Sequence, residues 1–227
     1  IVVSGGARGV TAACLYELLQ RTPAKLAILG RTALQDEAAD LAAFTTDAEL
    51  KKALLARYQG AGQQVTPMEL NKEVSGILNM REVRNNLAKL ESTGSKDLYI
   101  PTDISDENSV ADSVEQAREA FGPITAIVHA AGFLADKEIQ KKTDEQFQSV
   151  FSTKVAGLKN LLSATELDPL THMICFSSVA ARVGNNGQVD YAMANEVLNR
   201  VCQEEKFRRG AGFIAKSIGW GPWAGGM

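Results

Sequence analysis

The sequence predicts an α/β protein built on a doubly wound parallel sheet. Short apolar runs alternate with amphipathic helix patterns, which is typical of a parallel sheet with helices on both faces. Most of the runs are continuous rather than alternating, as expected for strands covered on both faces. The expected strands are residues 1–6, 26–31, 98–103, 126–132, 173–178 and 213–220. The expected helices are residues 11–21, 106–121, 143–164 and 190–209, with further helical segments within 35–95.

The connection between the second and third strands is unusually long. The second strand ends near Arg31 and the third starts near Leu98, whereas a crossover needs only about a dozen residues. We therefore expect a helical insertion over about 34–97.

Within this insertion, the stretch TPME (66–69) predicts a helix start, with the threonine as cap, the proline at the first helical position and the glutamate reaching back. A narrow apolar stripe follows at helical spacing, formed by Met80, Val83, Leu87 and Leu90. Two interpretations stay open: the stripe packs on the protein's own body, or it docks another domain.

The composition is that of an ordinary globular domain. The 227 residues are 45% hydrophobic and 22% charged, and the net charge of -3 provides no basic surface for nucleic acid. No apolar run approaches the roughly 20 residues that cross a bilayer, and no targeting peptide is visible. We therefore expect a cytoplasmic protein without a membrane or nucleic-acid partner. Buried reduced thiols are expected at Cys14, Cys175 and Cys202, and no metal site at His129 or His172.

The stretch SGGARGVT (4–11) lies between the first expected strand and the first expected helix. Gly5 and Gly9 bracket a turn that lets the backbone approach a pyrophosphate at the helix N-terminus. A glycine-rich turn alone is weak evidence, but the strand before it and the helix after it are the right context. The residues expected to bind the cofactor here are Gly5, Gly6, Arg8, Gly9 and Val10.

The end of the second strand indicates which dinucleotide is bound. An NAD site usually places an acid there, whereas an arginine accommodates a 2′-phosphate. This chain has Arg31 at that place and no acid until Asp36, and Arg8 adds a second cation. The sequence therefore favours NADPH. The alternative is that Arg31 is only a solvated surface arginine.

Two further segments lie where strands end, at the ligand-binding edge of such a sheet. Asp103 and Ile104 follow the third strand, although this stretch also fits a plain turn with a helix cap. Ala130, Ala131 and Gly132 end the fourth strand, and their small size would let a ring or ribose approach the backbone. The alternative for these three residues is tight packing alone.

The candidate reacting groups begin with Tyr191 and Asn195, which are four residues apart and so share one helix face. Ser178 ends the fifth strand, thirteen positions before Tyr191. A loop of that length can return the chain to the same sheet edge, where both hydroxyls could face one carbonyl oxygen. The alternative is a core tyrosine whose hydroxyl finds a structural partner.

Lys154 is the third candidate. It falls within the apolar stripe of its helix, four residues after Val150 and four before Leu158. Lysine is almost never buried without a partner, so this position favours a functional role over a side chain that snorkels to solvent. An ammonium close to the tyrosine would lower its pKa from about 10 towards neutrality. The serine would hold the carbonyl, and the asparagine would hold the lysine or ordered water.

These residues resemble the short-chain dehydrogenase/reductase superfamily, which has a Rossmann-type fold. More narrowly, they resemble the ketoreductase domains of polyketide and fatty-acid megasynthases. Ordinary members of the superfamily carry a lysine four residues after the tyrosine and an asparagine on the earlier helix, whereas here Asn195 and Lys154 are exchanged. The segments that carry the resemblance are FSSVAARVGNNGQVDYAMAN (176–195), HAAG (129–132), KVAGLKNLL (154–162) and IGWGPWAGGM (218–227).

The chain looks most similar to the ketoreductases of bacterial polyunsaturated fatty-acid synthases. The resemblance implies NADPH-dependent reduction of a β-ketoacyl thioester on an acyl carrier protein. It gives Tyr191 the proton and Ser178 the carbonyl contact, with Lys154 and Asn195 in support. It also places Gly5, Gly9, Arg31, Asp103 and the HAAG segment on the cofactor.

The chain departs from the family pattern in several places. Thr11 stands where the family has its last glycine. Leu134 and Asp136 match two residues of the Leu-Asp-Asp motif of ketoreductases that make the D product, and no tryptophan of the opposite class precedes Tyr191. The resemblance therefore favours the D (3R) alcohol. By the same comparison, we expect the family's N-terminal structural half and last strand to lie outside residues 1–227.

Two other functions are possible for this pattern. A catalytically silent scaffold domain typically loses the tyrosine or the glycine turn, and both are present here. A free-standing alcohol dehydrogenase or epimerase on the same fold would keep a lysine four residues after Tyr191, where this chain has Asn195.

Overall fold

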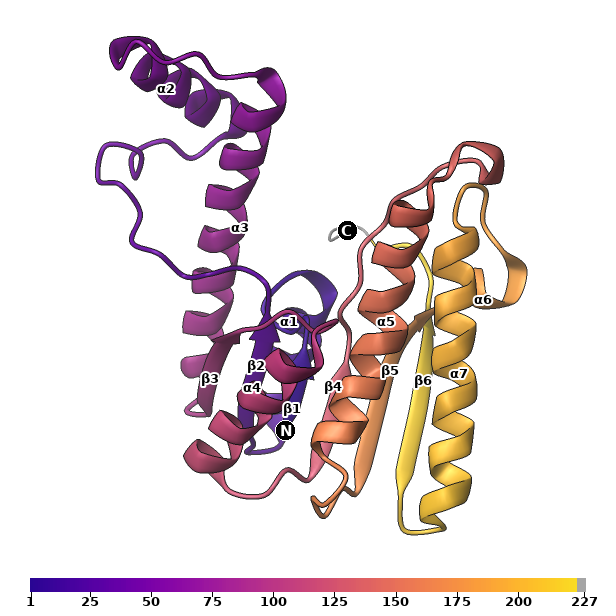
Figure 1. The fold of residues 1–227 in the computed structure, drawn as a ribbon. Helices are drawn as coiled ribbons and strands as arrows, with labels where there is room; N and C mark the ends of the chain where they lie inside the picture. The colour runs from indigo at the N-terminus through magenta and orange to yellow at the C-terminus, as the bar shows by residue number, and fades with distance from the viewer. Residues whose placement is uncertain (224–227) are drawn as a thin grey trace.

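Within residues 1–223, six strands form one parallel sheet in the order β3-β2-β1-β4-β5-β6 (Figure 1). The structure is a computed structural model that describes residues 1–223, so the last four residues of the 218–227 motif lie outside the described part. The strands are β1 (Val2–Ser4), β2 (Lys25–Gly30), β3 (Lys96–Pro101), β4 (Ala126–His129), β5 (His172–Ser178) and β6 (Ile214–Trp220).

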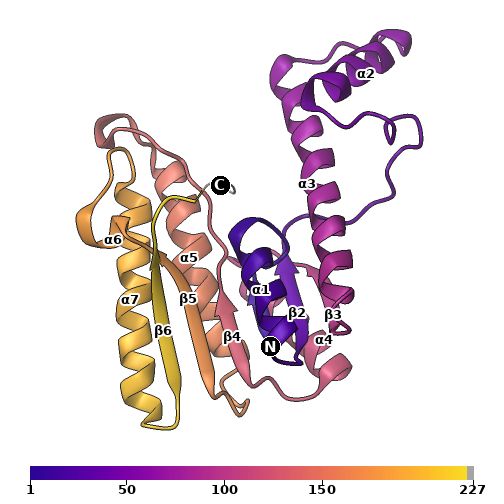
Figure 2. The ribbon, with the colours of Figure 1, turned by 180° about the vertical axis from the view of Figure 1, so that it is seen from behind.

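Helices cover the sheet on both faces, which confirms the doubly wound architecture (Figures 1 and 2). One face packs against α4, α5 and α7, and the other packs against α1 and α3. The helices are α1 (Gly9–Arg21), α2 (Asp47–Gly60), α3 (Pro67–Glu91), α4 (Glu107–Phe121), α5 (Asp144–Ala164), α6 (Ala180–Val183) and α7 (Val189–Arg209). A 3-10 turn, η1, spans Ile139–Lys141.

Local signals explain why the helices start where they do. The predicted capping boxes of α3 and α5 are both present, with Thr66 and Thr143 as the caps. Thr46 forms a third capping box at the start of α2. Each box pairs N–H groups that a helix start otherwise leaves without partners.

The insertion between β2 and β3 is confirmed as helical. The sheet-proximal part of α3 packs Val83 and Leu90 into the core that contains α1, so the predicted stripe does pack on the protein's own body. The N-terminal half of α3 extends past the sheet and meets α2 in a small separate core of Leu50, Leu54 and Val74 (Figure 1).

Some strands differ from the predictions. β1 spans Val2–Ser4 instead of residues 1–6, and β3 spans Lys96–Pro101 instead of 98–103. β4 ends at His129 instead of residue 132, because the next three residues turn towards the glycine turn after β1. The expectation that the strands are covered on both faces is wrong for β6, where Ile214 and Ile218 are 44% and 36% exposed. Figure 2 shows β6 without a helix in front of it on this side.

Two expectations from composition can also be compared with the structure. All three cysteines are free; Cys175 and Cys202 are buried as expected, whereas Cys14 is only half-buried. Within residues 1–223, the helices are too short or too polar to cross a membrane.

Candidate active site

The glycine turn lies where the strand order reverses, between β1 and β4. Gly5 and Gly9 adopt positive φ angles of 73° and 55°, which other residues rarely adopt. A Cβ on Gly5 would lie 2.8 Å from the backbone nitrogen of Ala131. The turn and the segment after β4 therefore form one tight backbone surface at the switch point, where dinucleotides bind in such sheets.

Three other predicted cofactor residues, Arg31, Asp103 and Ile104, have different surroundings. The Arg31 guanidinium is 5.2 Å from the centroid of the Phe133 ring, and its charge helps to lower the pKa of Asp103. The larger cause of that lowered pKa is a pair of hydrogen bonds from Ser105 to the Asp103 carboxylate. Asp103 thus forms a turn before the next helix, which was the alternative interpretation of this stretch. The Ile104 side chain is buried in the core, so only its backbone faces the sheet edge.

The structure brings Ser178, at the end of β5, close to Tyr191, in the first turn of α7. The Ser178 and Asn195 side chains face the Tyr191 phenol and favour its ionised form, but burial outweighs them and raises its pKa. The Ser178 hydroxyl oxygen accepts a hydrogen bond from the N–H of Ala180 at 3.1 Å.

Lys154 of α5 is 3% exposed, so it does not snorkel to solvent. Its Nζ donates a hydrogen bond to the backbone oxygen of Phe176 at 3.1 Å and lies 5.4 Å from the centroid of the Tyr191 ring. Burial lowers the pKa of this lysine from 10.5 to about 8. The predicted lowering of the Tyr191 pKa is wrong for this structure, because the ammonium is directed to a carbonyl and burial of the phenol dominates.

The same lysine connects the reacting groups to the glycine turn. A Cβ on Gly132 would lie 2.9 Å from Cε and 3.1 Å from Nζ of Lys154. Gly132 directly follows Ala131, which contacts Gly5. Four segments that are distant in the sequence therefore lie together: the glycine turn, the HAAG segment, α5 at Lys154 and α7 at Tyr191.

Asn195 is fully buried one turn after the tyrosine, and its Nδ2 donates to the Tyr191 backbone oxygen at 2.8 Å. Its Oδ1 has no hydrogen-bond partner among residues 1–223. The expectation that Asn195 holds the lysine is therefore wrong for this structure. A buried acceptor of this kind normally binds a donor, so the amide is free to receive one at the site.

His129 was predicted near the site only as part of the HAAG segment, without a role of its own. It is fully buried, its Nδ1 lies 2.7 Å from Oγ of Ser4, and its Nε2 lies 2.9 Å from the backbone oxygen of Lys154. Burial lowers the pKa of the imidazole to about 3, so it is neutral. It links β1, β4 and α5 behind the site, and the only signal in the sequence was its place in the HAAG segment.

A buried ion pair was also missed. Nζ of Lys142 lies 2.7 Å from Oδ2 of Asp190, with both side chains at most 3% exposed. Lys142 also donates to the backbone oxygen of Ala135, and the Asp136 carboxylate accepts from Nε2 of Gln188 at 2.9 Å. These contacts fasten the segment that follows β4 to the start of α7. The partly exposed Leu134 lies in the same segment.

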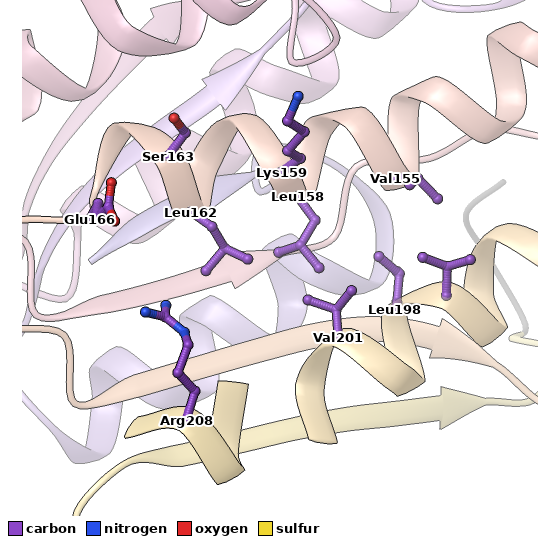
Figure 3. A pocket seen from close by; sticks show the side chains of 10 residues that line it. Val155, Leu158, Lys159, Leu162, Ser163, Glu166, Leu198, Val201 and Arg208 are labelled. Atoms are coloured by element: carbon purple, nitrogen blue, oxygen red, sulfur yellow. The ribbon is translucent and has the colours of Figure 1, made fainter. Parts of the chain in front are cut away.

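An apolar pocket lies away from these groups, between α5 and α7 (Figure 3). Leu158 and Leu162 of α5 face Leu198 and Val201 of α7 across it. It contains none of the predicted catalytic or cofactor residues, so we do not assign the reaction to it.

The residues at the switch point fit a nicotinamide dinucleotide. A side chain at Gly5 would collide with the backbone of Ala131, so only glycine lets the turn lie this close to the segment after β4. The buried Oδ1 of Asn195 has no hydrogen-bond partner among residues 1–223, and the Ser178 side chain faces the phenol. Together, the parallel sheet, glycine turn and convergent hydroxyls define a dinucleotide-binding domain of the short-chain dehydrogenase/reductase type.

Comparison with known proteins identifies the family. A family model described as "KR domain" matches residues 1–225, and the chain belongs to this family. The resemblance to ketoreductase domains of polyketide and polyunsaturated fatty-acid synthases is thereby confirmed. Membership implies an oxidoreductase domain that uses a nicotinamide cofactor.

Among curated relatives, a polyunsaturated fatty acid synthase polypeptide of Thraustochytrium sp. is 40% identical over 238 residues, covering 100% of this chain and 8% of that protein. Polyketide synthase PksL of Bacillus subtilis is 36% identical over 151 residues, covering 63% of this chain and 3% of that protein. The chain therefore spans only a small fraction of the length of these relatives.

Solved structures give the same assignment. An N-terminal ketoreductase from the macrolactin assembly line superposes with a TM-score of 0.74 at 27% identity, covering 98% of this chain and 36% of that chain. A ketoreductase domain from the bacillaene assembly line gives 0.73 at 26% identity, covering 100% of this chain and 45% of that chain. A short-chain dehydrogenase/reductase mutant from Serratia marcescens, at 18% identity, has the same fold.

Proposed function

We propose that this domain reduces a β-ketoacyl thioester, held on the phosphopantetheine arm of an acyl carrier protein, to the D (3R) β-hydroxyacyl thioester with NADPH. The carrier and the other domains of a polyunsaturated fatty-acid or polyketide synthase are its partners, in the cytoplasm. The convergence of Tyr191, Ser178 and Lys154 beside the glycine turn is the observation that carries this proposal.

Ketone reduction adds a hydride to the carbonyl carbon and a proton to the oxygen. When bound at the switch point, the cofactor would supply the hydride to the carbonyl carbon and would be oxidised to NADP⁺. Tyr191 donates its proton to the carbonyl oxygen, and Ser178 holds that oxygen by a hydrogen bond. Because burial raises the pKa of Tyr191, the phenol is protonated at neutral pH, as a proton donor must be.

Lys154 and Asn195 support this step. The lysine Nζ lies 5.4 Å from the centroid of the phenol ring, where its positive charge would favour the phenolate and oppose the larger effect of burial on the Tyr191 pKa. The buried Oδ1 of Asn195 has no partner among residues 1–223, and we assign to it a water molecule that would return a proton to the tyrosine.

The preference for NADPH rests on the cations at the ends of β1 and β2. Arg31 follows β2 where an NAD site would carry an acid. Arg8 lies close enough to the β3 residue Tyr99 to affect its pKa. Both arginines thus lie near the end of β2, where the 2′-phosphate would bind.

The D product is supported by the segment after β4. Leu134 and Asp136 match two positions of the family motif for this stereochemistry, and the contact between Asp136 and Gln188 holds the segment against the start of α7. We assign this segment the role of guiding the substrate towards Tyr191.

The test uses the full-length protein, trans-1-decalone or a β-ketoacyl thioester, and NADPH. Ketone-dependent oxidation of NADPH is expected, with a loss of at least about a hundredfold in Tyr191→Phe. Tyr58→Phe is the matched control, because Tyr58 lies on α2, outside the site (Figure 1). Chiral analysis of the product is expected to give the 3R alcohol. Folded protein without turnover would support the scaffold interpretation instead.

A further inference from the structure

The inserted helix α3 reaches the glycine turn through one carboxylate. Oε2 of Glu82 lies 2.8 Å from Nε of Arg8, and Oε1 accepts a hydrogen bond from the backbone N–H of Gly9 at 3.0 Å. Figure 1 shows α3 descending beside α1 to the sheet. Since Glu82 belongs to the insertion between β2 and β3, its contact with this turn could not be expected from the family motifs.

Glu82 occupies groups that recognise anions. The N–H of Gly9 is the first of the N–H groups that α1 leaves without a helical partner, and the N-cap residue, Arg8, provides no side-chain cap. Such N–H groups and a nearby guanidinium are what a cofactor phosphate uses at this turn. The Glu82 carboxylate therefore lies where it competes with a phosphate.

The carboxylate is ionised and accessible. Although partial burial opposes ionisation, the contacts with Arg8 and Gly9 hold the pKa of Glu82 below its usual value. The side chains of Arg8 and Glu82 are 46% and 41% exposed, so the pair can open to admit a ligand. While the pair is closed, the negative charge of Glu82 offsets one of the two arginine charges near the end of β2.

We propose that Glu82 is a specificity-determining residue that reduces the preference of this domain for NADPH over NADH. Its charge repels the 2′-phosphate that only NADPH carries, and it occupies Arg8. NADH has no group that needs this arginine, so it is affected less. This inference rests on the proposed function, because it concerns the cofactor site of that reaction.

The position of α3 does not depend on Glu82. Nδ2 of Asn86, one turn later, donates to the backbone oxygen of Ala7 at 3.0 Å, and Val83 and Leu90 anchor the helix in the core. Glu82→Gln therefore removes the charge without releasing the helix. Glu82→Ala serves as a second variant that also removes the hydrogen bonds.

The experiment measures hydrogen exchange of peptides covering residues 4–15 in the full-length protein, titrated with NADPH or NADH. Protection of these peptides gives a Kd for each nucleotide at this site, independently of turnover. Glu82→Gln and Glu82→Ala are each expected to lower the NADPH Kd about fivefold more than the NADH Kd, because both nucleotides carry the pyrophosphate and only NADPH carries the 2′-phosphate. The control, Glu91→Gln, removes a charge from the exposed end of the same helix and is expected to change neither Kd.

An unchanged or raised NADPH Kd, or equal tightening of both nucleotides, would overturn the inference. Exchange of the peptide that covers Val83 and Leu90 reports whether α3 stays folded in each variant. If wild-type protein shows neither protection by nucleotide nor turnover that depends on Tyr191, the proposed function fails, and this inference fails with it.

Discussion

Replacing Lys154 by methionine is expected to stabilise the domain while ending ketone reduction. Lys154 is almost completely buried, and its Nζ makes one hydrogen bond within residues 1–223, to the Phe176 oxygen. The groups that shift its pKa include no carboxylate. A buried charge without an opposite charge is costly, so the lysine is retained for function and not for stability.

The magnitude follows from the pKa of Lys154, which burial lowers from 10.5 to about 8. Because each pKa unit corresponds to about 1.4 kcal/mol, keeping the ammonium in the folded state costs about 3 kcal/mol. Losing the hydrogen bond to Phe176 lowers the stability of the variant by about 1 kcal/mol. Methionine has a similar length and fills the space, so the net stabilisation expected for Lys154→Met is about 2 kcal/mol at pH 7.

The dependence on pH distinguishes this cause from better packing. Below a pH of about 8, Lys154 is protonated in both the folded and the unfolded state, so the full free-energy cost of burying the ammonium applies. Between about 8 and 10.5, the unfolded chain binds a proton that the folded protein does not, so the wild type gains stability as the pH rises. The advantage of the methionine variant is expected to shrink across that range.

Hydrogen exchange of α5 and β5 peptides in the full-length protein measures this effect. At pH 7, exchange in Lys154→Met is expected to be about thirtyfold slower than in wild type, and the ratio falls towards one by pH 10. Lys159→Met, an exposed lysine on the same helix, is expected to change nothing. Faster exchange in Lys154→Met at pH 7, or a ratio that does not fall, would refute the reasoning.

Three further predictions concern the site and its supports. Gly5→Ala places a Cβ 2.8 Å from the nitrogen of Ala131 at a φ of 73°, so nucleotide protection of the turn is expected to weaken at least about tenfold. Asp190→Asn leaves the buried ammonium of Lys142 without its carboxylate, which is expected to destabilise the start of α7 by about 3 kcal/mol in hydrogen exchange, with partial recovery on adding Lys142→Met. Ser178→Ala is expected to lower kcat/KM about a hundredfold with an unchanged nucleotide Kd, since it loses one hydrogen bond to the carbonyl.

The features that could be predicted from the sequence are those with local signals. The capping boxes at Thr66 and Thr143 and the apolar stripes marked helices to within about two residues. The four-residue spacing of Tyr191 and Asn195 placed both on the buried face of α7. The glycine turn could be predicted because the sequence patterns of the strand before it and of the helix after it were both clear.

The features that were missed depend on contacts between distant segments. Glu82 meets Arg8 across 74 positions and Lys142 meets Asp190 across 48, and neither pair has a local pattern. The spacing of Glu82 and Asn86, one turn apart along the flank of the apolar stripe, was the only trace of the contact between α3 and the glycine turn.

The pKa of Tyr191 was mispredicted for a related reason. The sequence placed a lysine near the phenol, but it could not give the direction of the ammonium or the depth of burial. Lys154 is directed to the Phe176 oxygen, and desolvation raises the pKa of the phenol. Opposing electrostatic effects of this kind can be compared only when the distances are known.

The most direct measurement follows the hydride and the proton donor together. Full-length protein is given a β-ketoacyl carrier protein and NADPH deuterated on either face of C4 of the nicotinamide, and the product is analysed by mass spectrometry. One deuterium at C3 of a 3R hydroxyacyl chain, from one of the two labelled cofactors, is expected for wild type and for Tyr58→Phe, and essentially none for Tyr191→Phe. Equal labelling in Tyr191→Phe would show that this phenol is not the proton donor and would contradict the account.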